Sequence, residues 1–187
     1  QSRMAPVVVW NPPVWTRHLA LLLMVPVFPL LLATYLPGRI QAEDFDQGGA
    51  GFGHWDAEGA NQGGNAYRST DVDLGPNTTD DGTPHIGWIE PDEWWNYTFV
   101  VRRGATGTLA ARVSTIHSGK SFEVHLNDRI LTKSVTVPNT GSWSKYVTVP
   151  IARLSLRPGT YRLRVIANTD LFNLNWLELR ETRHEIR

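Results

Sequence analysis

Clustered carboxylates and histidines are the side chains of this sequence that could perform catalysis. Glu90, Asp92 and Glu93 form the densest acidic cluster, and a glycosidase would need two carboxyl groups about 5–9.5 Å apart across a cleft. His117 and His125 lack the i, i+4 helical spacing of a zinc enzyme. Serine-hydrolase, phosphate-loop and dinucleotide-binding motifs are absent from the sequence. The sequence therefore predicts a binding or assembly protein and not an enzyme.

Tryptophan is the other residue type that could carry a function, and the chain has 8 of them. Trp94, Trp95 and Trp176 lie inside strand patterns, where we expect burial in a core. Trp143 lies in a Gly-Ser turn, which favours exposure, and the residue pattern around Trp88 fits either environment. An exposed indole ring is a surface on which an apolar ligand face can stack.

Composition and charge exclude several classes of protein. The chain has 187 residues, enough for one ordinary domain and an appendage. Lys and Arg together number 18, as do Asp and Glu, so the net charge is zero and we expect no nucleic-acid partner. Cysteine is absent, which excludes disulfides, thiolate zinc sites and iron–sulfur clusters. The 16 Gly and 12 Pro favour a loop-rich all-β domain.

The first element expected along the chain is an apolar segment. Residues 19–36 read LALLLMVPVFPLLLATYL without a charge, and as a helix they would extend about 27 Å, close to the ~30 Å hydrocarbon core of a bilayer. We expect a single transmembrane helix over residues 19–36, preceded by an extended or interfacial arm over residues 1–18. A cleaved signal peptide is the alternative interpretation.

Flanking charges and internal prolines add two expectations for this segment. Two arginines precede it and only Arg39 follows before an acidic stretch, which favours a single-pass membrane protein with its C-terminal domain periplasmic or extracellular. Pro26 and Pro29 leave carbonyl groups without helical donors. Integral membrane proteins packing on residues 1–38 could cover those groups, and a kinked single anchor is the other possibility.

After Arg39 the pattern changes to short alternating runs separated by Gly, Pro, Asn and Asp. This pattern is typical of an antiparallel sandwich. We expect an all-β jelly-roll β-sandwich over residues 39–180, followed by a tail over residues 181–187. The strand patterns are residues 95–101, 108–115 and 121–127, then KSVTVP, YVTVP, TYRLRVIA and LNWLELR. Because the terminal strands of a jelly roll commonly pair, residues 40–45 should lie beside residues 176–179.

Five segments, in this order, resemble a family-six carbohydrate-binding module, a jelly-roll accessory domain found beside polysaccharide-degrading enzymes. They are IQAEDF, HWDAEGANQGGNAYRSTDVDL, HIGWIEPDEWWNYTF, VPNTGSW and FNLNW. The resemblance covers about residues 39–180. It implies a non-catalytic module in which the acidic cluster around Glu93 serves the structure of a turn.

The resemblance also implies a sugar-binding site. In the family, two aromatic rings and an Asn hold a sugar in a cleft at the loop end of the sandwich. The positions matched here are Trp88, Trp143 and Asn173. The chemistry agrees, since a pyranose ring has an apolar face that stacks on indole, and an amide offers hydrogen bonds to hydroxyl groups. The expected partner is a polysaccharide or oligosaccharide.

A structural calcium ion near the paired terminal strands is a further implication of the resemblance. Gln41, Glu43 and Asn175 match the positions of its ligands, and backbone carbonyls would complete the site. Gln41 and Asn175 carry amides where many relatives have a carboxylate. Because lower ligand charge weakens cation binding, we expect reduced calcium affinity.

Two functions fit these features. The first is a membrane-anchored carbohydrate-binding module that binds glycan in a Trp/Trp/Asn cleft. The second is an accessory or structural subunit that stabilises a multi-subunit membrane complex, for example a respiratory or photosynthetic one, with the sugar-binding fold reused for assembly. The fold alone does not distinguish them.

Overall fold

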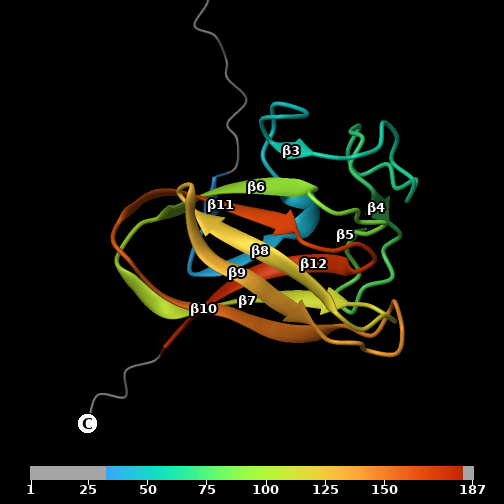
Figure 1. The fold of residues 1–187 in the computed structure, drawn as a ribbon. Coiled ribbons are helices and arrows are strands. Elements are labelled where there is room, and N and C mark those ends of the chain that lie inside the picture. The colour runs from blue at the N-terminus through green and yellow to red at the C-terminus, as the bar shows by residue number, and fades with distance from the viewer. Residues whose placement is uncertain (1–32, 183–187) are drawn as a thin grey trace, which may run out of the picture. The chain divides into compact units, whose positions relative to one another are not determined.

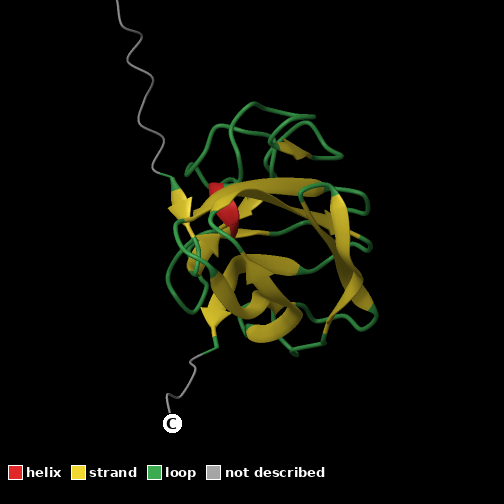
Figure 2. Ribbon diagram, turned by 90° about the vertical axis from the view of Figure 1, so that its left-hand side faces the viewer, coloured by secondary structure: helices red, strands yellow, loops and turns green. Residues whose placement is uncertain are grey.

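The computed structural model describes residues 33–182, which form a β-sandwich of two layers (Figures 1 and 2). Within these residues there are two six-stranded sheets. The first contains, in spatial order, β1 (Thr34–Tyr35), β6 (Trp94–Val101), β11 (Gly159–Ala167), β8 (Lys120–Leu126) and β9 (Arg129–Val137), with β3 (His54–Trp55) also paired to β6. The second contains β10 (Val147–Leu156), β7 (Ala105–Ser114), β12 (Asn173–Glu181), β5 (His85–Ile86) and β4 (Leu74–Gly75), with β2 (Gly38–Gln41) paired to β12. The prediction of an all-β sandwich is confirmed.

The core lies between the sheets and follows the period-two alternation of the strands. On β6, Trp95, Tyr97 and Phe99 are almost fully buried, because alternate residues of a strand face the same side of the sheet. The same rule corrects one expectation. Trp94 precedes Trp95 directly and therefore faces outward, where it is only half-buried. Trp176 is buried, as expected.

The terminal strands pair, as predicted. β2 runs antiparallel to β12, with Gln41 opposite Trp176 and Gly38 opposite Leu179. A single 3₁₀ turn, η1 (Ala42–Asp44), follows β2 and carries Glu43 into the interior. This pairing is what brings the beginning and the end of the domain together.

The sandwich begins earlier than the sequence suggested. Thr34 and Tyr35 form β1, which pairs in parallel with Phe99 and Val100, and Leu36 is buried in the core. The expected transmembrane helix over residues 19–36 is therefore wrong at its end, because Thr34 and Tyr35 form a strand on β6 and the Leu36 side chain is buried in the core. Residues 19–32 of that segment, the arm over residues 1–18 and most of the tail lie outside the described residues. Within residues 33–182, no helix has the length and apolar character needed to cross a bilayer.

The two ends of the sandwich differ in their connections. At one end, the turn end, residues 102–104, 127–128 and 157–158 join successive strands tightly. At the opposite end, the loop end, residues 87–93, 115–119, 138–146 and 168–172 make longer connections. The long segment between η1 and β5 also packs there, on the right of Figure 1. The antiparallel registers place all of the first group at one end and all of the second at the other.

Candidate functional site

A cleft of about 390 Å³ opens at the loop end. This size is within the range of roughly 300–1,000 Å³ that is typical of small-ligand sites. The residues that line the cleft come from four separate segments: Pro76, Thr78, His85, Trp88, Trp143, Ser144, Leu171 and Asn173. Fold topology therefore brings together the three residues singled out from the sequence, Trp88, Trp143 and Asn173.

Trp88 is held outward by an unusual backbone. It follows β5 and has φ +49°, a left-handed conformation that is an outlier for a bulky residue. The turn allows Ile86 and Ile89 to be completely buried while the indole between them remains 42% exposed. Strain of this kind costs about 1–3 kcal/mol and concentrates at functional sites.

Trp143 lies on the loop between β9 and β10, and its backbone is fixed by hydrogen bonds. Its carbonyl oxygen accepts from Ser114 Oγ at 2.6 Å and from Asn173 Nδ2 at 3.2 Å. His117 packs edge-on against the indole, with ring centroids 5.7 Å apart. The ring itself is 38% exposed, as its turn position suggested. The loop thus presents a rigid aromatic face to the cleft.

Asn173 begins β12 and is 6% exposed. Its amide nitrogen donates to Ser114 Oγ at 3.3 Å as well as to the Trp143 carbonyl. The amide oxygen faces Gly87, where a Cβ atom would lie only 3.0 Å away, so glycine leaves this side of the amide open. Asn173 therefore has two connected roles, since it orients Trp143 through its nitrogen and leaves its oxygen as an acceptor.

His85 is a lining residue that the sequence did not single out. It is 5% exposed, and its Nδ1 atom has no hydrogen-bond partner within residues 33–182. Burial lowers the pKa of the imidazole, although a hydrogen bond to the Pro76 backbone opposes this shift, so the ring is neutral at pH 7. Tyr146 packs edge-on against it at 6.2 Å. His85 lies two residues before Gly87, and nothing in the surrounding sequence indicated that this position lines a site.

The cleft contains no ionised side chain. No Asp, Glu, Lys or Arg is among its lining residues in the described part of the chain. Glu93, from the acidic cluster considered for catalysis, is 1% exposed and accepts hydrogen bonds from the backbone of Ala57 and Glu90, both at 3.1 Å. Burial is the largest cause that raises its pKa to about 7. This carboxyl group buttresses two loops and does not face the cleft.

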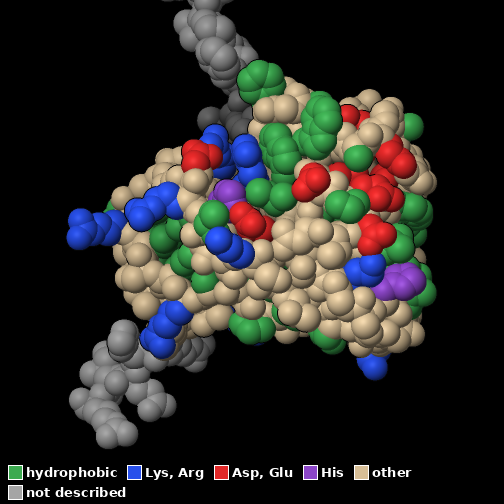
Figure 3. Space-filling view, viewed as in Figure 1, with side chains coloured by type: hydrophobic (Ala, Val, Ile, Leu, Met, Phe, Trp, Pro, Cys, Tyr) green, Lys and Arg blue, Asp and Glu red, His purple; other side chains and the backbone are tan. Residues whose placement is uncertain are grey.

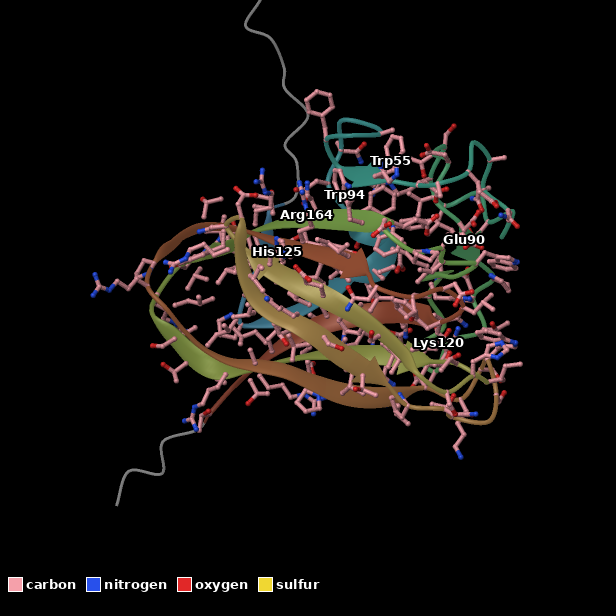
Figure 4. All side chains as sticks on the ribbon, in the orientation of Figure 1. Trp55, Glu90, Trp94, Lys120, His125 and Arg164 are labelled. Atoms are coloured by element: carbon pink, nitrogen blue, oxygen red, sulfur yellow. The ribbon has the colours of Figure 1, made fainter. Side chains whose placement is uncertain are left out.

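Trp94 lies away from the cleft, on the outer face of the first sheet. The Arg164 guanidinium stacks on its ring at 4.1 Å, and the Arg164 Nε donates to Asn96 at 2.9 Å. Trp55 pairs beside it through β3, and Figure 4 shows Trp55, Trp94 and Arg164 grouped on this face. The outer face of the first sheet and the loop end thus place aromatic side chains in different surroundings, with Trp94 against an arginine and Trp88 and Trp143 on a cleft.

The residues proposed for calcium, Gln41, Glu43 and Asn175, converge on a carboxylate that the sequence analysis did not include. Asp81 accepts hydrogen bonds from Asn175 Nδ2 at 3.1 Å and from Gln41 Nε2 at 3.3 Å. Thr83 donates to Asn175 Oδ1 at 3.0 Å and also bonds Asp81. The DDG turn that contains Asp81 was the available signal, but only folding brings it to the terminal strands.

The protonation of the two carboxyl groups at this second site differs strongly. Burial raises the pKa of Glu43 to about 8. Burial also acts to raise the pKa of Asp81, but hydrogen bonds from Asn175, Thr83 and neighbouring groups outweigh it and hold that pKa well below the usual value. Gln41 Oε1 and Glu43 Oε2 are buried without a partner among residues 33–182. These orphaned oxygens and the Asp81 carboxylate are the donor types that a hard cation takes.

The donor set is nevertheless modest in charge. Within residues 33–182 no three His, Cys, Asp or Glu side chains come together as a metal-binding group. The site therefore relies on the Asp81 carboxylate and on Glu43, whose raised pKa favours the protonated form at pH 7, together with amide and hydroxyl oxygens. The oxygen donors are of the kind that calcium takes, and the reduced affinity expected from the amides stays a prediction.

Comparison with known proteins relates the chain to one group. A family model described as Carbohydrate binding module (family 6) matches residues 62–181. The solved structure of a β-1,3-glucan-binding module from Bacillus halodurans is 28% identical, with a TM-score of 0.54, over 79% of this chain and 98% of that one. A module of lichenase 5A from Cellvibrio mixtus, solved with cellotriose, is 20% identical, with a TM-score of 0.55, over 79% and 98%. The C-terminal module of a laminarinase from Zobellia galactanivorans is 22% identical, with a TM-score of 0.55, over 75% and 95%.

Proposed function

Because this chain belongs to family 6 of the carbohydrate-binding modules, we propose that it binds a neutral polysaccharide or oligosaccharide in the loop-end cleft, without catalysing a reaction on it. The single observation that carries the proposal is the convergence of two exposed indoles and a buried amide on one cleft. Four segments of the chain, residues 76–78, 85–88, 143–144 and 171–173, supply the lining.

The chemistry of the lining suits a sugar. Trp88 and Trp143 offer exposed indole faces on which the C–H face of a pyranose stacks. Asn173 offers its amide oxygen to sugar hydroxyls, and the neutral ring of His85 lines the cleft beside it. Since no ionised group lines the cleft, an uncharged glycan would lose no ionic hydration on binding and is favoured over a uronate polymer.

The first ligands to test follow from the similar structures. One of these modules is described as binding β-1,3-glucan, and another was solved with cellotriose. Isothermal titration calorimetry with laminari- and cello-oligosaccharides should give a saturable heat for at least one series. Trp143→Ala should weaken this binding at least ~10-fold, about 1.4 kcal/mol, with little change in melting temperature because the ring is an exposed loop side chain.

Trp55→Ala is the matched control for that substitution. Trp55 is 48% exposed, compared with 38% for Trp143, and lies outside the cleft. Its removal should leave sugar affinity within ~2-fold of the original value. Equal losses in both variants, or full binding by a folded Trp143→Ala protein, would remove the cleft from the proposal.

We also propose that Gln41, Glu43 and Asn175, together with Asp81 and Thr83, hold a structural calcium ion. When bound, the ion would supply positive charge that ties β2 and η1 to β12 and to the 79–83 turn. An ion bound only by the folded state stabilises it by about 2.7 kcal/mol at a hundredfold excess over Kd. Melting curves with millimolar calcium and with EDTA should differ by several degrees; identical curves would contradict calcium binding.

We propose finally that apolar residues 19–33 keep the protein at a membrane, with the sandwich on the periplasmic or extracellular side. Their uncharged sequence supports this. As a helix they would extend only about 22 Å, short of a ~30 Å hydrocarbon core, so the stretch suits shallow insertion better than a full span. Extraction of native membranes in mild detergent tests the alternative role: fixed-stoichiometry recovery with integral membrane proteins packed on residues 1–38 would favour an accessory subunit of a membrane complex.

A further inference from the structure

Charge is divided sharply between two parts of the chain. Residues 43–93 hold 12 of the 18 acidic residues and a single basic one, Arg68. Residues 94–182 hold 12 of the 18 Lys and Arg and only five acidic residues. In the space-filling view, acidic side chains gather at the upper right, near the loop end, and most basic ones lie toward the left (Figure 3). The net charge is zero, but acidic and basic side chains are concentrated in different parts of the molecule.

The turn end concentrates this positive charge. Arg102 and Arg103 lie in the turn after β6, Arg129 begins β9, and Arg157 lies in the turn after β10. All four are exposed, and none forms an ion pair within residues 33–182.

Acidic side chains at this end are few. Asp128 pairs with Arg162 at 2.5 Å, and Glu178 pairs with Arg39 at 3.6 Å and with Arg180. Glu181, at the end of β12, adds one more carboxyl group. The four unpaired arginines therefore leave a net positive surface.

Exposed apolar side chains lie among these arginines. Tyr35 is 44% exposed, with the Arg102 guanidinium stacked on its ring at 3.9 Å. Ile130, next to Arg129 in the β8–β9 hairpin, is 53% exposed. Aromatic and aliphatic side chains interspersed with basic ones are typical of surfaces that rest in the headgroup zone of a bilayer.

The chain also enters the sandwich at this end. β1 pairs with Phe99 and Val100, near the end of strand β6 that leads into Arg102. The residues that immediately precede β1 read LALLLMVPVFPLLLA, from Leu19 to Ala33. β1, which this apolar sequence precedes, thus lies at the same end of the domain as the basic surface, while the cleft opens at the other end.

We propose that the turn end docks on an anionic lipid surface, with Arg102, Arg103, Arg129 and Arg157 contacting lipid phosphates and Tyr35 and Ile130 seated among the headgroups. Guanidinium groups bind phosphate in paired hydrogen bonds, and an acidic bilayer complements this end while repelling the acidic loop end. Docking in this orientation leaves the cleft facing away from the membrane. The inference does not depend on what the cleft binds.

Vesicle flotation of the full-length protein tests this surface. The probes are vesicles of phosphatidylcholine alone and vesicles with about 30% phosphatidylglycerol. Because one basic residue near an anionic surface contributes about fivefold to partitioning, the original protein should prefer the anionic vesicles at least ~25-fold in 50 mM salt. The preference should largely disappear in 500 mM salt, where charges are screened within about 4 Å.

Two double variants with the same change in net charge separate position from total charge. Arg103→Glu with Arg157→Glu should remove most of the anionic preference. Lys133→Glu with Lys145→Glu, at positions away from the turn end, should retain it within ~3-fold. Equal losses in the two variants would reduce the effect to net charge and overturn the proposal. Binding to soluble heparin without binding to anionic vesicles would also overturn it, in favour of a soluble polyanion.

Discussion

Left-handed backbone occurs at both ends of the sandwich, but only the loop end, which also has Asp92 at φ +69°, places bulky apolar residues in it among residues 33–182. At the turn end, Asn127 and Asp128 have φ +48° and +63° in the β8–β9 hairpin, where such residues are readily accommodated. At the loop end, Trp88 and Leu171 have φ +49° and +54°, and both line the cleft. Bulky residues adopt this conformation only when their surroundings enforce it. The comparison indicates that the turn end is optimised for stability and the loop end for presenting side chains.

The interactions that hold the connecting segments in place also differ between the two ends. Loop-end segments are held by buried side chains that bond to backbone, such as Glu93 to Glu90 and Thr140 to Thr115. At the turn end, strand pairing continues almost to the turns, and the ion pair of Arg162 and Asp128 is exposed. Polar deletions should therefore be costly at the loop end and nearly neutral at the turn end.

Glu93→Ala should have the largest effect of the substitutions that test this contrast. The change leaves two backbone donors without their acceptor in a buried site, which costs about 2–3 kcal/mol. Arg162→Ala, which removes one exposed ion pair, should change stability by less than about 0.5 kcal/mol. Urea unfolding at pH 7 measures both values. Comparable losses in the two variants would show that the ends do not differ as proposed.

A pH titration of stability probes the same end without mutation. The carboxyl groups with raised pKa all lie in residues 43–93: burial is the main cause of pKa values of about 6 for Asp56 and Asp73, about 7 for Glu93 and about 8 for Glu43. A raised folded-state pKa means that the folded protein holds protons that the unfolded chain has lost, so stability decreases as pH rises through these values.

Between pH 6 and 8.5, with EDTA present, the melting temperature should therefore decrease. A loss of about 2 kcal/mol corresponds to roughly 4–8 °C for a domain of this size. Glu93→Gln should flatten the profile, because a neutral amide has no proton to lose. A melting temperature that rises over this range would contradict the assigned directions.

Trp88→Asn should give a smaller effect of opposite sign at the loop end. Asn tolerates the left-handed backbone, so relief of strain should stabilise the fold by about 0.5–1 kcal/mol, while the loss of the indole abolishes sugar binding. Asn127→Ala, the counterpart at the turn end, should destabilise by about 1 kcal/mol, since Ala does not favour φ +48°. Thermal unfolding measures the change in stability of each variant, and calorimetry measures the loss of sugar binding. If Trp88→Asn is destabilised, the packing of the indole contributes more to stability than the backbone strain costs.

The sequence predicted the sandwich because alternation is a local signal. Hydrophobic residues at every second position place β6, β7, β8 and β11 close to their observed bounds. The expectation that Trp94 is buried did not apply this signal, since two adjacent tryptophans cannot both face one side of a strand. The sequence also assigned residues 34–36 to the preceding apolar segment, because hydrophobic runs do not reveal whether their partner is lipid or the edge of β6.

Residue identities and their order along the chain determined which side chains could serve as ligands: Trp88, Trp143 and Asn173 for sugar, and Gln41, Glu43 and Asn175 for calcium. Only tertiary structure decided that the first three line one cleft, that His85 joins them, and that Asp81 enters the second group. It also decided that a chain of zero net charge separates its arginines from its carboxylates. These features depend on strand register and loop closure over long sequence separations, and no local pattern encodes which distant segments come into contact.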